Sequence, residues 1–332
     1  MTIQWSKPMN EAVNIDPITI PDKLEWLEKR YWRFGQDEAF EEFLMDLYNI
    51  DEEGQMTAHP RRDPLTNETK GLMILGGTGN GKSALLNRAL RANPVLTEFT
   101  EETPGNTLFI TVPPEATIKK VAEIILARTG YKKIDSKLRA ADAWEIARHR
   151  FRLVGVTTLM IDECHHIVRS GAGRDVLAAI QSLKHIMQSA QGVALIVAGV
   201  PSLRDVIMSE PSGETYRRFT EYHVGKIRPG SRSAELFGKN FLKSAEKLGI
   251  GVHLEDAVSE RILFAQAGEV GRSVALAKDI IRDAVIRKQE TLSLERAERV
   301  YMKRNSNLDM TPFSPGTWGK IKADLEAMGW VQ

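Results

Sequence analysis

The sequence lacks the features that mark secreted or membrane proteins. Its 332 residues contain one cysteine, Cys164, which excludes a disulfide within the chain and is typical of a reducing compartment. The N-terminal residues have no apolar core of a signal peptide. The longest apolar run, residues 193–200, is far shorter than the about 20 residues that a transmembrane helix needs. No internal repeat is present. We therefore expect a cytoplasmic protein without a membrane partner.

The chain also has almost no net charge, since 45 Lys and Arg residues face 44 Asp and Glu residues. The charges are unevenly distributed. Residues 1–69 carry 7 basic and 15 acidic side chains, whereas residues 117–152 carry 10 basic and 4 acidic ones. A basic segment of this kind is typical of a nucleic-acid-binding surface. A solvated helix face has the same composition, however, and charge alone favours that simpler interpretation.

Residues 76–83, GGTGNGKS, match the phosphate-binding P-loop pattern G-x-x-x-x-G-K-[ST]. The apolar run 71–75 predicts a strand before the loop and residues 83–90 predict a helix after it, which favours a P-loop over a glycine-rich turn without a ligand. Lys82 is expected to reach the β- and γ-phosphates of ATP, and Ser83 to bind Mg²⁺. The predicted ATP contacts are Gly76, Gly77, Thr78, Gly79, Asn80, Gly81, Lys82, Ser83 and Ala84.

A second motif follows about 80 residues later, where the apolar run 157–161 ends in Asp162 and Glu163. Apolar strands that end in two acids are common, but the P-loop upstream favours the Walker B interpretation. Asp162 would then bind Mg²⁺, and Glu163 would act as the general base that activates the attacking water. The pair favours hydrolysis, because nucleotide kinases with a P-loop need no such base.

Two histidines come directly after this motif, in Cys164-His165-His166. A zinc site is one interpretation of this run. No second Cys/His pair stands at ligand spacing elsewhere in the sequence, so we expect local packing and support of the neighbouring acids instead.

The remaining pattern predicts an α/β fold, with a parallel sheet wrapped by helices and an all-helical lid at the C-terminus. Further strands are expected at 107–112, 193–198 and 220–224, and helices at 117–130, 140–153 and 175–191. The lid helices are expected at 231–248, 255–267, 272–289 and 293–304. The predicted domains are an N-terminal arm and aromatic-rich helical region (1–60), which we expect to pack on the nucleotide domain, then the P-loop core (61–228), the lid (229–304) and a tail with one short amphipathic helix (305–332).

Two adjacent arginines, Arg217 and Arg218, precede the strand at 220–224. They are candidates for an arginine finger offered to the ATP of a neighbouring subunit, because a guanidinium forks onto phosphate oxygens. The alternative is a cation at a helix C-terminus. Their position relative to the other motifs favours a finger, and the sequence leaves open which arginine it is. The strand at 193–198 is followed by Gly199, where ATPases of this layout often carry a polar residue that senses the γ-phosphate. Ser202 is the nearest hydroxyl, so this sensor stays unidentified.

Together these motifs resemble those of an AAA+ ATPase. The exact sequences of the motifs resemble the TniB/TnsC family of transposition regulators, including the short TnsC proteins of CRISPR-associated transposons. The resemblance covers residues 60–304. The motifs that carry it are GGTGNGKS (76–83), FITVPP (109–114), IDECHH (161–166), AGVPS (198–202) and YRRF (216–219).

The resemblance implies a P-loop AAA+ fold, ATP and Mg²⁺ as cofactors, and hydrolysis of ATP. It implies ATP-dependent assembly of the protein with itself, as a ring or filament, on duplex DNA. It also implies partnership with a transposase and with a target selector of the TniQ type. Arg272 would be a second phosphate-sensing arginine, and the DNA contacts would be Thr117, Lys119, Lys120 and Arg150. A replication-initiator or helicase-loader type of AAA+ ATPase, and a switch ATPase that binds only proteins, stay open as alternatives.

Overall fold

A computed structural model of the chain describes residues 19–169, 174–189, 191–305 and 309–330, and these form two compact units. The first unit holds Glu38–Thr78 and Lys82–Val224. The second holds residues 19–37, Gly79–Gly81 and 225–330. The described part of the N-terminal region that we expected to be one domain, residues 19–60, is thus divided between the two units.

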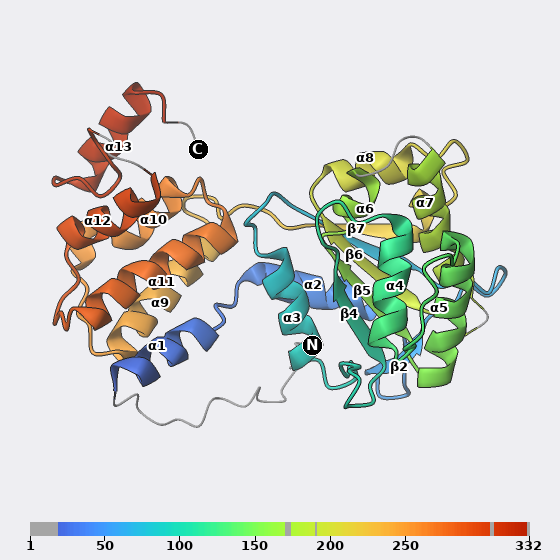
Figure 1. Ribbon diagram of the computed structural model, residues 1–332. Helices are drawn as coiled ribbons and strands as arrows, with labels where there is room; N and C mark the ends of the chain where they lie inside the picture. Colours follow the sequence, from blue (N-terminus) through green and yellow to red (C-terminus); the bar gives the residue numbers. More distant parts are fainter. Residues whose placement is uncertain (1–18, 170–173, 190, 306–308, 331–332) are drawn as a thin grey trace. The chain divides into compact units, whose positions relative to one another are not determined.

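The first unit is built on a parallel sheet (Figure 1). The sheet has five strands in the order β4-β5-β6-β3-β7. Its strands are β3 (Gly71–Leu75), β4 (Thr107–Thr111), β5 (Thr158–Asp162), β6 (Ala194–Gly199) and β7 (Phe219–His223). Every residue of β3, β5 and β6 is buried, which explains why these segments read as continuous apolar runs. The expected α/β fold with a parallel sheet is confirmed, and each expected strand is present.

Two hydrophobic cores cover the two faces of this sheet, and they use alternate residues of β3 because side chains alternate along a strand. Met73 and Leu75 join the core on the side of α4, α5 and α7, whereas Leu72 and Ile74 join the core on the side of α2 and α3 (Figure 1). The covering elements are α2 (Gly35–Met45), β1 (Tyr48–Ile50), β2 (Met56–Pro60), α3 (Lys82–Ala92), α4 (Ile118–Arg128), α5 (Ala140–Val154), α6 (His165–Arg169), α7 (Arg174–Met187), α8 (Ser202–Met208) and the short 3₁₀ helix η1 (Tyr216–Arg218).

The strand register brings the carboxyl ends of the strands to one edge of the sheet. Leu75, the last residue of β3, pairs with Gly199 on one side and with His223 on the other. Thr111 of β4 pairs with Asp162 at the end of β5. In parallel sheets wrapped by helices, ligands bind outside this edge.

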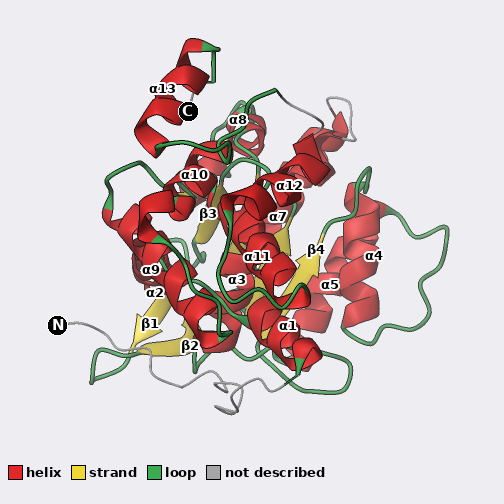
Figure 2. Cartoon of the chain, turned by 90° about the vertical axis from the view of Figure 1, so that its left-hand side faces the viewer, coloured by secondary structure: helices red, strands yellow, loops and turns green. Residues whose placement is uncertain are grey.

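In the part of the second unit that the structure describes, the regular elements are all helices (Figure 2). They are α1 (Ile20–Lys29), α9 (Arg232–Lys247), η2 (Leu254–Asp256), α10 (Val258–Ala265), α11 (Val270–Ile286), α12 (Leu294–Asn305) and α13 (Trp318–Ala327). The four helices expected for the lid correspond to α9 to α12, and the short helix expected in the tail corresponds to α13. Within the described residues, every helix is too short or too polar to span a lipid bilayer.

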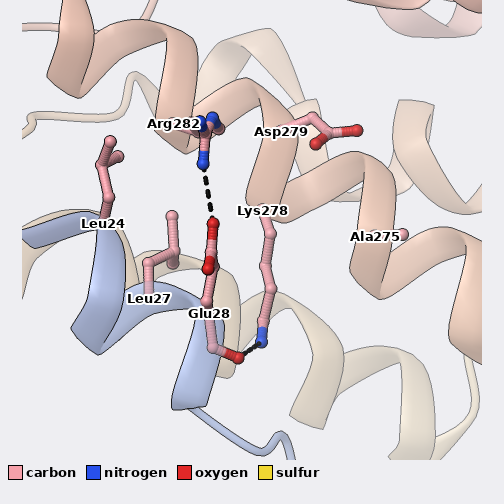
Figure 3. Close-up of a pocket in the computed structure, with 7 residues that line it drawn as sticks. All are labelled: Leu24, Leu27, Glu28, Ala275, Lys278, Asp279 and Arg282. Atoms are coloured by element: carbon pink, nitrogen blue, oxygen red, sulfur yellow. Dashed lines mark hydrogen bonds and ion pairs between the residues drawn. The ribbon is translucent and has the colours of Figure 1, made fainter.

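Helix α1 belongs to the second unit because its apolar face and its C-terminus both pack on α11. Leu24 and Leu27 of α1 line a cavity of about 280 Å³ together with Lys278 and Arg282 of α11 (Figure 3). Lys278 Nζ donates to the carbonyl oxygens of Glu28 (2.9 Å) and Arg30 (2.7 Å), which follow the last helical hydrogen bonds of α1. Burial lowers the pKa of this ammonium group. Trp26 and Trp32 pack in this unit, whereas Phe40 packs on the sheet.

The C-terminal segment is anchored in the second unit by Arg261, whose side chain is fully buried. Its guanidinium donates to the carbonyl oxygens of Pro312 (2.6 Å), Ser314 (3.2 Å) and Gly316 (2.7 Å), and lies 5.2 Å from the ring centre of Trp318. Ile321 and Leu325 of α13 are buried against Phe264. Residues 309–330 thus form part of this unit.

Candidate nucleotide-binding site

The P-loop lies between the end of β3 and the start of α3, at the carboxyl edge of the sheet. Gly79 and Gly81 have φ angles of +87° and +88°, a conformation that side chains with a Cβ rarely adopt. Lys82 is buried, and its Nζ donates to the carbonyl oxygens of Gly76 (2.8 Å) and Gly77 (3.0 Å). Ser83, in the first turn of α3, is exposed. The local pattern therefore folds as the motif requires, with a positive charge and a hydroxyl group beside the loop.

Asp162 and Glu163 stand at the same edge, since β5 and β3 both flank β6. Asp162 is buried, and its Oδ1 accepts a hydrogen bond of 2.9 Å from the backbone N–H of Glu163. Glu163 has a φ of +55°, which is unusual for a residue other than glycine and is often found at functional sites. The side chain of Glu163 is 34% exposed, so water reaches its carboxylate.

The two histidines after this pair contact Glu163. His165 Nδ1 lies 3.3 Å and His166 Nε2 lies 3.9 Å from Glu163 Oε2, and the two imidazole rings are 4.2 Å apart. The ligand atoms of this trio lie within 4.8 Å of one another, so two imidazoles and a carboxylate offer a set of donors that suits a transition metal. Cys164 is not part of the set, because it is buried and burial raises the pKa of its thiol to about 12. We expected Cys164, His165 and His166 to pack locally and to support the neighbouring acids. The two histidines contact Glu163, whereas Cys164 is buried in the core.

The tip of β6 has no space for the polar side chain that we looked for at Gly199. A Cβ at this position would lie 2.9 Å from Leu203 Cδ2 and 3.4 Å from His165 Cβ. Ser202 begins α8, where its side chain is exposed.

The structure separates the two candidate finger arginines. Arg218 is 9% exposed and forms a two-pronged ion pair with Glu68, and it also donates to the carbonyl oxygen of Glu214. Arg217 is exposed, and its side chain makes no hydrogen bond or ion pair with any described residue. Glu68 is a partner of Arg218 that the sequence analysis missed, because it stands 150 positions away and belongs to no motif.

Arg272 belongs to the second unit, as do Gly79–Gly81 at the tip of the P-loop. Its backbone N–H donates to Gly79 O (3.0 Å), and a Cβ at Gly79 would lie 2.8 Å from Arg272 Cγ. Within the second unit, Arg272 therefore contacts Gly79; its role as a phosphate sensor stays a prediction.

The four predicted DNA contacts differ in what their side chains already do. Thr117 caps α4 by accepting from the N–H of Lys120 (3.2 Å). Lys119 Nζ donates to Ser136 O (2.7 Å), and Arg150 donates to Thr129 O at the end of α4. Lys120 is the one exposed cation among these four residues, at 57% of its side chain, and its Nζ lies 3.7 Å from Glu123 Oε2. Three exposed lysines in the loop between α4 and α5 were not singled out by the sequence analysis: Lys132, Lys133 and Lys137.

Comparison with known proteins identifies both fold and family. The structure of Aeropyrum pernix ORC1 in complex with DNA is similar, with a TM-score of 0.59 and 17% identity over 85% of this chain and 68% of that one. Pyrobaculum aerophilum Cdc6p has a TM-score of 0.52 and 13% identity over 87% of this chain and 68% of that one. The structure of the ADPNP–ADP complexes of Aeropyrum pernix ORC2 has a TM-score of 0.52 and 13% identity over 86% of this chain and 72% of that one. At these identities the likeness shows the fold alone, which is the P-loop AAA+ fold.

A search of curated proteins finds no sequence similar to this chain. The family model of the bacterial TniB protein, in contrast, matches residues 51–228, more than half of the chain. This match spans the P-loop, Asp162, Glu163 and the two arginines, and it confirms the resemblance seen in the sequence. The chain therefore belongs to the bacterial TniB protein family.

Proposed function

We propose that this protein is a Mg²⁺-dependent ATPase that assembles on duplex DNA and regulates DNA transposition, linking a target selector of the TniQ type to the transposase. The family supports transposition. One structural observation supports the ATPase. Strands β3 and β5 flank β6 and end at the same edge of the sheet. The loop after β3 leads to Lys82 and Ser83, and β5 ends in Asp162, which Glu163 follows.

The residues at this edge provide the groups that ATP hydrolysis needs. Lys82 and the N–H groups of the P-loop bind the phosphates. The hydroxyl of Ser83 and the carboxylate of Asp162 are oxygen ligands, which Mg²⁺ prefers, and the metal offsets the negative charge of the phosphates. Glu163 takes a proton from the attacking water, and its partial exposure gives water access to the carboxylate.

Hydrolysis is completed by an arginine of a neighbouring subunit, and the arrangement of contacts favours Arg217 for this task. Glu68 forms an ion pair with Arg218. Two residues near Arg218 are also held: the Tyr216 hydroxyl donates to Glu221 Oε1 (2.5 Å), and Glu214 forms an ion pair with Lys184. The turn is therefore rigid, while the Arg217 side chain at its surface is available to a second copy of the chain. A rigid turn lowers the entropic cost of placing a finger.

Duplex DNA is bound through the basic segment 117–152. Contacts of lysine with phosphate are independent of sequence and weaken with salt. The exposed lysines, Lys120 and those of the α4–α5 loop, suit this task better than Lys119 and Arg150, whose side chains bind backbone carbonyls of their own unit.

The decisive experiment compares Lys82→Ala with Lys70→Ala, an exposed lysine just before β3. Binding of a fluorescent ATP analogue and release of phosphate are measured for both variants and the wild type. Lys82→Ala should lose ATP binding and hydrolysis while keeping its thermal unfolding midpoint, and Lys70→Ala should behave as the wild type. Unchanged ATP affinity in Lys82→Ala would end the proposal.

The two alternatives differ from this proposal in their dependence on DNA and on transposon ends. A protein-only switch ATPase would show no salt-dependent affinity for duplex DNA. A replication initiator or helicase loader would bind DNA without changing where a transposase inserts. A salt titration of DNA binding, followed by a reconstituted transposition assay with and without the protein, separates the three.

A further inference from the structure

The turn between β5 and α6 passes closely over the tip of β6. Cys164 N–H donates to Ala198 O (2.8 Å), which ties the turn to β6 just before Gly199. A Cβ added at Gly199 would approach His165 Cβ to 3.4 Å and Leu203 Cδ2 to 2.9 Å. The tip of β6 thus carries no side chain of its own, and His165 borders the space that such a side chain would enter.

His165 is also the buried partner of Glu163. Its side chain is 5% exposed, and its Nδ1 lies 3.3 Å from Glu163 Oε2. His166, whose side chain is 24% exposed, is more distant, at 3.9 Å. The imidazole of His165 is enclosed, whereas the carboxylate that it contacts is partly open to water. The contact therefore limits the rotamers of a side chain that would otherwise move freely.

The backbone at Glu163 points to the same contact. A φ of +55° is disfavoured for a residue with a Cβ, and it persists only where the surroundings determine it. Here Asp162 Oδ1 accepts from the Glu163 N–H, and the following N–H is bound by β6. Fixed at both of these points, the turn sets the Glu163 side chain beside the histidines.

We propose that His165 is a positioning residue for Glu163, and that its Nδ1 is the group through which it acts. Nδ1 faces Oε2 across 3.3 Å, a close polar contact that is not aligned as a hydrogen bond. With its proton on Nδ1, the ring favours the carboxylate orientation that keeps Oε2 beside it and leaves the other oxygen to receive the proton of water. His166 has a minor part in this. The inference rests on the proposed role of Glu163 as general base. Misplacing a catalytic group by about 1 Å costs roughly 10²-fold in rate, which sets the expected effect.

The test uses side chains that keep one nitrogen position of the ring. Asparagine places an amide N–H₂ near the position of Nδ1, whereas glutamine places it near Nε2. His165→Ala should lower the kcat of ATP hydrolysis about 10- to 100-fold and change KM and ATP affinity by less than about twofold. His165→Asn should recover most of kcat and His165→Gln little of it. His59→Asn, an exposed histidine of β2 that serves as the control, should stay within about threefold of the wild type. All assays contain a zinc-selective chelator, so that metal bound by the trio does not affect the rates.

The proposal is overturned by a wild-type kcat in His165→Ala or by equal recovery of kcat in His165→Asn and His165→Gln. It is also overturned if His165→Ala loses as much ATP affinity as kcat, because that result indicates a role in folding alone. If His165→Ala does not fold, the comparison of Asn with Gln decides. The Lys82→Ala and Glu163→Gln variants are measured in parallel. Hydrolysis that depends on both but not on His165 refutes only this inference. A wild type without ATPase activity refutes the proposed function, and the inference with it.

Discussion

Arg218 and Glu68 form a two-pronged ion pair across 150 positions of sequence, with Nε to Oε2 at 2.9 Å and Nη2 to Oε1 at 2.8 Å. Their side chains are 9% and 19% exposed. Gln188 Nε2 donates to the same carboxylate (2.7 Å). The pair occupies the guanidinium of Arg218 and links the η1 turn to the segment before β3. Arg217 beside it is left at the surface, so two adjacent arginines have different surroundings.

Arg217→Ala should lower ATP hydrolysis steeply while leaving the unfolding midpoint unchanged. Arginine fingers are worth about 10³–10⁵ in rate in other P-loop systems. Because the proposed finger acts in trans, mixing Arg217→Ala with Lys82→Ala should restore part of the activity at interfaces that combine an intact ATP site with an intact Arg217. Phosphate release at varied mixing ratios checks this. Full activity of Arg217→Ala alone, or no rescue in the mixture, would contradict it.

Glu68→Gln should destabilise the first unit by about 1–3 kcal/mol, since it leaves a mostly buried guanidinium without its anion. The hydrogen bond from Arg218 lowers the pKa of Glu68 below its ordinary value of 4.5. The folded protein therefore takes up a proton there less readily than the unfolded chain. The ion pair therefore stabilises the folded state fully at pH values above 4.5, the ordinary pKa of the carboxyl group, and this stabilisation is lost as the pH falls through the lowered pKa of Glu68. Urea unfolding at pH 7 and pH 3.5 should show the difference from the wild type shrinking at the lower pH. Glu102→Gln, an exposed control, should show no difference at either pH.

Glu163→Gln should bind ATP but not cleave it, because the amide keeps the shape of the side chain and loses the base. If subunits meet through ATP, uncleaved ATP stabilises the assembly by mass action. Complexes of this variant with duplex DNA should therefore outlive those of the wild type when they are diluted into competitor DNA with ATP present. In a transposition assay, target choice should loosen. The idea that hydrolysis times release is refuted if the variant dissociates as fast as the wild type while its ATPase is inactive.

Replacing exposed lysines of the basic segment should weaken DNA binding evenly across sequences. Lys120→Ala and Lys132→Ala/Lys133→Ala should each flatten the dependence of log Kd on log salt by about one unit per lost phosphate contact. Arg150→Ala should instead lower the unfolding midpoint, because its guanidinium binds Thr129 O at the end of α4. Fluorescence anisotropy across a salt series measures the slope, with Lys70→Ala as the surface control. A loss confined to one DNA sequence would speak against backbone contacts.

Arg261→Met should release the C-terminal segment while leaving the helices α9 to α12 folded. The substitution removes charged hydrogen bonds to three carbonyl oxygens in residues 312–316, which we expect to cost about 2–4 kcal/mol. Limited proteolysis should then cut between residues 309 and 317 many times faster than in the wild type. Arg282→Met, whose guanidinium lies at the surface on Glu28, should not change the rate of cleavage there. Equal protection of Arg261→Met and the wild type would show that the apolar contacts of α13 hold the segment by themselves.

The sequence by itself determined the parts of this protein that short windows encode. The P-loop lies within eight residues, its flanking strand and helix are set by local pattern, and buried strands such as β5 and β6 read directly as apolar runs. The order of these elements was sufficient to predict a parallel sheet with a helical lid. Asp162 and Glu163 were found in the same way, because their place is the end of such a strand.

Only the tertiary structure decided which side chains meet across long distances in sequence. Arg217 and Arg218 are equivalent in the sequence, and Glu68 distinguishes them. Helix α1 resembles a neighbour of the P-loop core by its position in the chain, but Lys278, 250 positions beyond Glu28, places it in the second unit. The relation of His165 to Glu163 depends on a left-handed residue and on the missing side chain at Gly199. Periodicity shows which face of an element is buried, whereas the partner of a buried charge is set by the packing of elements that the local pattern does not connect.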